Sequence, residues 1–525
     1  MAEATAPAAW KPRYNPWLIA LAVMMATVIE VLDTSVANVA LPHIAGNLSV
    51  TNHEATWVLT SYLVSNAIIL PAAAWFGGFF GRKRVLITCI MIFTAASMLC
   101  GLANSLGFLI FARILQGLGG GALQPISQAI LLESFPREKR GQAVAVFSMG
   151  VVVAPIIGPI VGGWITDNLS WRWVFLINLP IGILSIFLAR LFIEDPPYLK
   201  KGMAGSRIDY IGFSLMAIGL GTLQLVLDKG QEVDWLQAPW LCWASGVIVA
   251  ALIAFVWWEL RVRHPVVDLR IFRDRNFALG TIAITVVGAV LYGTLALLPL
   301  FFQTLMGYSA YLSGLAIGPR GIGAFLAAIV IGRLSGKVSN RLLLGTGFFI
   351  LGWTCCLMGN INLQMGLNSI IWAVIGNGTA LPMVFIALTT MSMWTIRNED
   401  MGNASGLFNL MRNIGGAVGI AAATTILARM EQVHRVYLGA HLTPYDPVYQ
   451  QALRHVEQTS ASLGIASSGM AAQAYIYKEL SRQAVLLSFV DNFFWFGALS
   501  FCFIPLVFLF RSGAKQRQGG LAAAH

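Results

Sequence analysis

The sequence predicts an all-α membrane protein with fourteen transmembrane helices. Of its 525 residues, 57% are hydrophobic and only 11% are charged, a composition typical of integral membrane proteins. Apolar runs recur along the whole chain, each long enough as a helix to cross a hydrocarbon core of about 30 Å. The Lys and Arg residues gather in short clusters between these runs. Membrane topology therefore explains the net charge of +11 better than nucleic-acid binding does.

Hydropathy places the predicted spans at 17–42, 56–80, 85–104, 107–132, 142–166, 173–193, 208–228, 239–260, 276–302, 310–332, 341–360, 369–395, 403–429 and 488–511. An even number of spans puts both chain termini on the same side of the membrane. The basic clusters of the short loops all fall on that side, whereas the opposite loops 43–55, 103–107 and 303–309 contain no Lys or Arg. The positive-inside rule therefore predicts that both termini are cytoplasmic.

The predicted organisation is two six-helix halves with an insertion between them. The segment "WFGGFFGRKRVLI" follows the second span and "GRLSGKVSNRLLL" follows the tenth, a faint repeat if spans seven and eight are inserted. The predicted parts are a cytoplasmic tail (1–16), an N-terminal half (17–193), two additional helices with linkers (194–260), a C-terminal half (261–511) and a cytoplasmic tail (512–525). A long outer loop, 430–488, has a composition that predicts short helices. Two halves around a central site are the arrangement of a transporter.

The first span contains two carboxylates, Glu30 and Asp33, within "VIEVLDTSVANVALP". Three residues of a helix turn by about 300°, so the two side chains lie about 60° apart on one face. Exposure to lipid would cost several kcal/mol each, so both must face the protein interior or an aqueous cavity. Proximity and desolvation disfavour ionisation of both acids, which suits groups that exchange a proton. The alternative is a static hydrogen-bonded acid, satisfied for instance by Thr34 or Asn38.

Three motifs carry a resemblance to a known family: "LDTSVANVALP" (32–42), "RILQGLGGGAL" (113–123) and "APIIGPIVGG" (154–163). They resemble signature motifs of the major facilitator superfamily, in the fourteen-helix drug:proton antiporter branch typified by EmrB and QacA. The resemblance continues through "GNASGLFNLMRNIGGAVGIA" and covers nearly the whole chain. The long loop before the last helix points to the EmrB type. The resemblance implies the major facilitator superfamily fold and a multidrug efflux protein.

The same resemblance implies a mechanism and partners. A protein of this type exports hydrophobic or amphipathic drugs by alternating access, with the proton gradient as its energy source and no cofactor. The EmrB type implies an EmrA-like periplasmic adaptor protein and a TolC-type outer-membrane channel. The chain would then be the inner-membrane component of a tripartite pump, in the bacterial cytoplasmic membrane. The alternative on the same scaffold is a dedicated exporter of an anionic metabolite, such as a siderophore or fatty acid.

The predicted proton-coupling residues are Asp33, Glu30 and Arg113. Asp33 matches the acidic position of the first-helix motif, and Arg113 matches the arginine that the family links to proton transfer. If Pro42 ends the first helix, Asp33 lies about 13 Å deep and Arg113 about 9 Å deep, so the two can meet. We expect Arg113 to pair with an ionised acid in one state and with substrate, backbone or water in another. The alternative is an arginine that only binds carbonyl groups.

A small-residue stripe in the fifth span, Ala154, Gly158 and Gly162, predicts the close approach of another helix. Prolines between these positions remove backbone donors and soften the helix. The resemblance assigns this motif to antiporters, which suggests export, although plain close packing is compatible with the same pattern. The residues of this conformational motif are Pro155, Gly158, Pro159, Gly162 and Gly163.

Two arginines inside spans, Arg320 and Arg412, could neutralise an anionic substrate in a central cavity. Arg412 lies nearer the cytoplasmic end and could equally snorkel or pack. The other candidate substrate-binding residues, for which packing or helix–helix hydrogen bonding is the alternative, are Asn38, Gln116, Asn178, Tyr292, Asn377, Phe408 and Asn409.

The loop after the second span departs from the family pattern. Gly78 stands where the pattern has an acid, and Gly336 stands at the equivalent position of the second half. A charge relay through that acid is therefore doubtful. We expect the basic run Arg82, Lys83 and Arg84 to act mainly through topology and lipid headgroups.

Other function classes find less support in the sequence. A membrane enzyme would need a cluster of nucleophile, base or metal ligands, but the seven His residues are all predicted in loops or tails and the Cys residues lack zinc spacing. We therefore predict no metal site and no catalytic residue. A channel is disfavoured by the paired halves and the buried acids. No phosphate-binding loop is present, so ATP is not the expected energy source.

Overall fold

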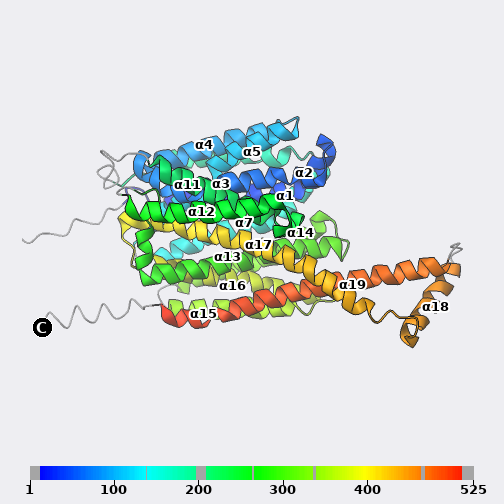
Figure 1. Cartoon of the computed structure of the whole chain (residues 1–525). Coiled ribbons are helices and arrows are strands. Elements are labelled where there is room, and N and C mark those ends of the chain that lie inside the picture. The colour runs from blue at the N-terminus through cyan, green and yellow to red at the C-terminus, as the bar shows by residue number, and fades with distance from the viewer. Residues whose placement is uncertain are drawn as a thin grey trace, which may run out of the picture.

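The computed structural model describes residues 12–136, 139–196, 209–262, 265–334, 338–462 and 468–510. Long helices lie side by side in one bundle, and α18 stands beyond one end of it (Figure 1). Within these residues, fourteen helical segments are long and apolar enough to cross a membrane. The predicted number of spans is therefore confirmed, and the chain is a multi-pass membrane protein. The predicted linker and tails fall mostly outside the described residues.

The helices follow the predicted order along the chain. They are α1 (Pro16–Leu48), α2 (Asn52–Ala55), α3 (Trp57–Phe80), α4 (Arg82–Gly101), α5 (Leu106–Gly120), α6 (Leu123–Ser134), α7 (Arg140–Asn168), α8 (Trp173–Leu176), α9 (Asn178–Phe192), α11 (Tyr210–Lys229), α12 (Pro239–Arg261), α13 (Arg275–Thr304), α14 (Ala310–Leu334), α15 (Asn340–Met358), α16 (Leu367–Met393), α17 (Met401–Gly439), α18 (Pro447–Ser462) and α19 (Ser468–Cys502). The fourth span consists of α5 and α6, and the sixth of α8 and α9.

Local sequence signals begin and end several of these helices. The Asn15 side chain accepts the Trp17 N–H at the start of α1, where Pro16 needs no hydrogen-bond partner for its nitrogen. Ser105 caps α5 and Asp274 caps α13 in the same way. Such caps satisfy backbone donors that the first turn of a helix leaves without an acceptor.

The first helix is longer than predicted. Pro42 lies inside α1, which continues to Leu48 and ends where Ser49 adopts a left-handed conformation, with φ of 55°. The prediction that the helix ends at Pro42 is therefore wrong, and so is the depth counted from it. Proline removes one backbone hydrogen bond of a helix but does not by itself stop a helix whose neighbours pack around it.

The long outer loop is mostly helical. α17 runs on to Gly439 and α19 begins at Ser468, so two spans extend well past their apolar parts, with α18 between them. The expected short helix is present as α18, whereas the second predicted one is the first part of α19. Hydropathy detects only the apolar part of a helix, which is why the predicted spans stop near 430 and start near 488 while the helices themselves extend further.

We call α1–α9 the N-terminal set and α13–α19 the C-terminal set. The inserted α11 packs against α3 of the first set and α17 of the second. The end of α11 and the segment after it reach both sets: the Lys229 amino group donates to the Thr56 hydroxyl at 2.6 Å, and the Trp235 indole donates to the Thr425 hydroxyl at 3.0 Å. The additional helices therefore lie beside the contact between the two sets.

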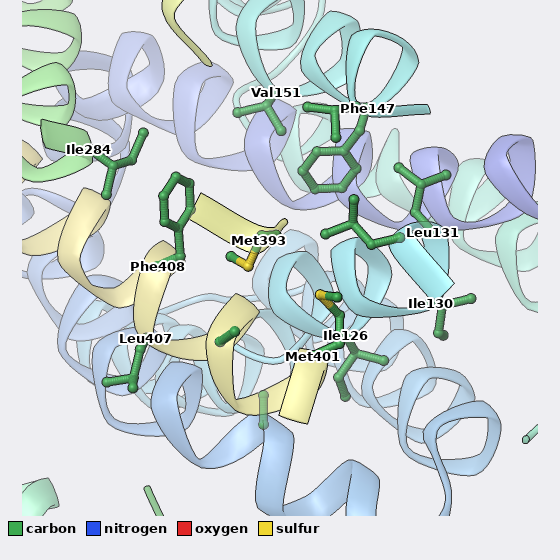
Figure 2. Close-up of a cluster of buried hydrophobic side chains, with 14 of the residues drawn as sticks. Ile126, Ile130, Leu131, Phe147, Val151, Ile284, Met393, Met401, Leu407 and Phe408 are labelled. Atoms are coloured by element: carbon green, nitrogen blue, oxygen red, sulfur yellow. The ribbon is translucent and has the colours of Figure 1, made fainter. Parts of the chain in front are cut away.

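The apolar core is continuous at one end of the bundle and divided at the other. We call the end at which α1 begins the Arg82 end, and the opposite end the α18 end. At the Arg82 end, one cluster of buried side chains combines α6 and α7 with α13, α16 and α17, including Phe147, Ile284 and Phe408 (Figure 2). Toward the α18 end there are two clusters, one from the N-terminal set and one mainly from the C-terminal set. The two sets therefore pack most continuously at the Arg82 end.

Candidate functional site

Asp33 lies at the centre of a polar group inside the N-terminal set, where its side chain is 1% exposed. Arg113 Nη1 donates to Asp33 Oδ2 at 2.6 Å. Two amides complete the group: Gln116 Nε2 and Asn178 Nδ2 donate to Asp33 Oδ1 at 2.8 and 2.7 Å. The prediction that Asp33 and Arg113 meet is confirmed, and we call these four residues the Asp33 group.

Arg113 is held on several sides. Its Nε donates to the Val58 carbonyl at 3.0 Å and its Nη1 also donates to Gln116 Oε1 at 2.8 Å. The guanidinium lies 4.2 Å from the centre of the Tyr62 ring, within cation–π distance. A buried ion pair is more stable when further hydrogen bonds satisfy its remaining polar atoms, and here Nε and Nη1 have such bonds whereas Nη2 has none with a described residue.

Glu30 has different partners, although it lies on the same helix and is also buried. Its Oε1 accepts from the Asn66 amide at 3.1 Å, and its Oε2 accepts from Gln124. Neither suggested local partner satisfies a carboxylate: the Thr34 hydroxyl donates to the backbone carbonyl of Glu30, and Asn38 is exposed. The two acids therefore belong to separate groups.

The Glu30 side chain is connected to the C-terminal set through Gln124. While the amide nitrogen of Gln124 donates to Glu30, its Oε1 accepts from Arg412 Nη2 on α17. One turn away on both helices, Asn409 donates to Gln128 Oε1. These contacts join α6 to α17 inside the bundle. We call Glu30, Asn66, Gln124 and Arg412 the Glu30 group.

Arg412 is 1% exposed but incompletely bonded. Its Nε and Nη1 make no hydrogen bond with a described residue. The Phe385 ring centre lies 5.9 Å from its guanidinium carbon, and the Tyr292 side chain lies within hydrogen-bonding reach of the guanidinium. The arginine is thus a buried cation bounded by aromatic rings.

Arg320 lies within the C-terminal set. Its Nη2 donates to the Thr294 hydroxyl at 3.0 Å, while its Nε and Nη1 also lack a described partner. The neighbouring Asn377 approaches Cys355 Sγ at 3.8 Å, and the same cysteine interacts with Arg320. Arg320 and Asn377 therefore share surroundings built from α13 to α16.

The predicted substrate-binding residues lie in several separate places. Arg320 and Asn377 lie together in the C-terminal set, Asn409 contacts Gln128, and Asn38 is exposed. Gln116 and Asn178 are in the Asp33 group, and Tyr292 lies beside Arg412. Phe408 belongs to the apolar cluster at the Arg82 end (Figure 2). The role of each in substrate binding stays a prediction.

The small-residue stripe of α7 packs against α1. A Cβ atom built on Gly158 would lie 2.4 Å from Ser35 Oγ, and one on Gly162 would lie 2.9 Å from Val36 Cγ1. The Ser35 hydroxyl donates to the Pro155 carbonyl at 2.8 Å, using the acceptor that Pro159 leaves free. The expected close approach is confirmed, whereas the role of this motif in conformational change stays a prediction.

Arg82 does not contact lipid headgroups as expected. It is 4% exposed and forms an ion pair with Glu133 of α6. The backbone N–H of Lys83 donates to Asp195 Oδ1 at 2.8 Å. Glu133 and Asp195, which lie in other segments, therefore provide the acidic partners that the loop itself lacks. The loop sequence alone could not reveal these partners, so the expected contact of Arg82 with lipid headgroups was wrong.

The histidines are not confined to loops. His43 lies in α1, His434 in α17 and His455 in α18, because these helices extend beyond the apolar spans. His434 Nε2 lies 2.7 Å from Asp491 Oδ2 on α19. Among the described residues, no group of three His, Cys, Asp or Glu side chains could hold a metal ion.

Sequence reasoning missed Asn66, Gln124 and Gln128 as members of the buried polar groups. Each is a polar amide inside an apolar span, and Gln124 and Gln128 lie one turn apart on one face of α6. That spacing was the available signal. Glu133, the partner of Arg82, lies at the end of the same helix.

Known proteins match nearly the whole length of this chain. Residues 23–420 match the model of the Major Facilitator Superfamily. The chain is 35% identical to fatty acid resistance protein FarB of Neisseria gonorrhoeae, over 96% of this chain and 97% of that protein. It is 34% identical to multidrug export protein EmrB of Escherichia coli K12, over 97% and 98% of the two chains. The human organic anion transporter MFSD10 matches in structure with a TM-score of 0.58 and 12% identity, over 93% of this chain and 100% of that one, a likeness of fold.

Proposed function

Because this chain belongs to the major facilitator superfamily, we propose that it exports hydrophobic or amphipathic drugs in exchange for protons. The observation that carries the proposal is the pair of buried carboxylates, Glu30 and Asp33, inside one membrane span. Ionisable groups at such positions are costly and mark substrate or proton pathways. The similarity to proteins named multidrug export protein EmrB supports drugs as the substrates. The proposal includes no enzyme activity and no cofactor, and the proton gradient supplies the energy.

Alternating access is the proposed mechanism. The single apolar cluster at the Arg82 end and the divided clusters toward the α18 end support a conformation closed at the Arg82 end. Opening that end requires breaking the contacts of Gln124 with Arg412, of Gln128 with Asn409 and of Arg140 with Asn398. All three contacts join the N-terminal set to residues of the other half.

We place the Arg82 end, with both termini, in the cytoplasm of a bacterium and the protein in its inner membrane. The α18 end then faces the periplasm, where α17, α18 and α19 extend beyond the other helices (Figure 1). This extension is the proposed docking element for an EmrA-like adaptor protein, which would join a TolC-type outer-membrane channel into a tripartite pump. Removal of residues 440–467 should abolish co-purification with such an adaptor while leaving drug binding intact.

A second candidate is the dedicated export of an anionic metabolite, such as a siderophore or fatty acid. The specific observation in its favour is the pair of buried arginines, Arg320 and Arg412, each with two nitrogens lacking a described partner. The similarity to a protein named for fatty acid resistance points the same way.

Proton release on adding drugs to the purified protein tests the proposal. Wild type should release protons, and Asp33→Asn and Glu30→Gln should be compared with it at several pH values. Loss of release with retained drug binding in either variant would assign the coupling proton to that acid. Unchanged release in both variants would remove the two acids from the mechanism.

A further inference from the structure

The search for a site beyond proton coupling leads to Arg412, where the two sets of helices meet. Its guanidinium has three nitrogens, of which Nη2 donates to Gln124 Oε1, and to Asn413 Oδ1 at 3.5 Å. Nε and Nη1 are buried and make no hydrogen bond of ordinary geometry with a described residue, while the Tyr292 side chain lies within hydrogen-bonding reach of the guanidinium. A buried charged donor without an acceptor is unfavourable, so these two nitrogens favour an anionic ligand.

The surroundings of Arg412 are apolar and aromatic. Phe385 of α16 lies beside the guanidinium and Tyr292 of α13 is within reach of its charge. Phe408, one turn earlier on α17, belongs to the cluster in which Figure 2 also shows Ile284. A cation beside a large apolar surface fits a molecule with one anionic group and an apolar body.

We propose that Arg412 binds the carboxylate of an amphipathic substrate, with Tyr292 and Phe385 flanking the carboxylate and Gln124 as its competitor. This inference rests on the proposed export function and names the chemistry of the site. A carboxylate binds a guanidinium bidentately across Nη2 and either Nε or Nη1, which gives short charge-assisted hydrogen bonds, so Gln124 must first leave Nη2.

In this proposal, the loss of the contact between Gln124 and Arg412 makes Arg412 available to a ligand. In this structure Gln124 Oε1 takes the place of a ligand oxygen at Arg412, and Gln124 comes from the N-terminal set. When the two sets separate at the Arg82 end, Gln124 leaves Arg412 and all three nitrogens become available. The same amide donates to Glu30, so ligand binding at Arg412 also releases or reorients a hydrogen-bond donor of that acid. Substrate and Glu30 are thereby linked through one side chain.

Arg320 provides the matched comparison. It is equally buried and has the same two nitrogens without a described partner. Its hydrogen-bond partner Thr294 belongs to its own set, so separation of the sets does not expose it. We therefore place the carboxylate at Arg412.

The test measures binding of radiolabelled decanoate and of uncharged decan-1-ol to the full chain in lipid nanodiscs. Wild type should bind decanoate at least tenfold more tightly than decan-1-ol. Arg412→Gln should abolish this preference, Arg412→Lys should retain part of it, and Arg320→Gln should keep it. Gln124→Ala should tighten decanoate binding, a gain that a merely structural role of Gln124 would not produce. Thermal unfolding of each variant checks that it is folded.

Two results would overturn the inference: an unchanged preference in folded Arg412→Gln, or an equal loss in Arg320→Gln. Proton release with an uncharged drug separates this site from the export proposal. If Arg412→Gln loses the decanoate preference but still releases protons with that drug, both proposals stand. If wild type prefers decanoate through Arg412 but releases no proton with any drug, the site stands and proton-coupled export fails.

Discussion

Glu30 and Asp33 lie three residues apart on α1, yet their surroundings differ in kind. Asp33 contacts a cation directly and accepts from two amides, and all of these partners belong to the N-terminal set. Glu30 accepts from two amides, one of which also contacts Arg412 of the other set. Spacing along a helix therefore predicts a shared face but not a shared environment.

The difference assigns different mechanical roles to the two acids. The Asp33 group moves as a unit with its own set, so its hydrogen bonds are independent of how far the two sets are apart. The Glu30 group includes a contact between the sets, so its hydrogen bonds change when that contact breaks. On this geometry, we propose that Asp33 mainly holds helices together and that Glu30 is the acid that responds to the proposed conformational change.

Arg113→Ala should have the largest effect, because it leaves the carboxylate of Asp33 buried without its cation. Loss of one partner of a buried ion pair costs about 3–5 kcal/mol. We expect this loss in the free energy of unfolding, measured by thermal or denaturant unfolding in detergent. The double variant Arg113→Gln with Asp33→Asn removes both charges and should recover most of it. A loss below about 1 kcal/mol for Arg113→Ala would show that the pair does not hold the helices together.

Much of the fold was predictable because a membrane span needs about twenty apolar residues in a row. The fourteen spans followed from that requirement alone. The extensions of α17 and α19 did not, because a helix outside the membrane needs no apolar run. The end of α1 was predicted too early because a proline inside a helix removes one backbone hydrogen bond but does not end a helix that neighbouring helices stabilise by packing.

Site residues that lie in a sequence motif were predictable. Their hydrogen-bond partners were less predictable where those partners come from distant parts of the chain. Asp33 and Arg113 followed from their motifs, although the depth counted from Pro42 was wrong. The contact of Glu30 with Gln124, and of Gln124 with Arg412, joins residues 94 and 288 positions apart. No local pattern fixes such a contact. Tertiary packing alone decides which buried amide meets which charge.

Gln124→Ala should have a smaller effect on stability than the loss of one partner of the Asp33–Arg113 ion pair. It removes a donor from Glu30 and the acceptor of Arg412 in one step, and leaving a buried polar group without its partner costs about 1–3 kcal/mol. We expect a loss in that range in the free energy of unfolding. Gln128→Ala, one turn away, removes a contact to the uncharged Asn409 and serves as the control. Equal losses in both variants would contradict a special role for the charged contact.

Glu30→Gln should change stability by about 1 kcal/mol or less, since a glutamine keeps an acceptor for one amide and the second amide can reorient. Asp33→Asn should cost more, because it leaves the Arg113 charge buried without its counterion. The same unfolding measurement applied to both variants tests the ordering. A larger loss for Glu30→Gln than for Asp33→Asn would reverse the roles assigned to the two acids.

The smallest expected effects come from removing one amide from each group. Asn178→Ala leaves Asp33 with Gln116 and Arg113, and Asn66→Ala leaves Glu30 with Gln124, so each should lower the free energy of unfolding by about 1 kcal/mol. The two variants should differ in function. If Glu30 responds to the separation of the sets, Asn66→Ala should shift the pH dependence of substrate-induced proton release, whereas Asn178→Ala should leave it in place. The opposite pattern would move the responsive acid to Asp33, because the amide that matters to proton release must be bonded to the acid that releases it.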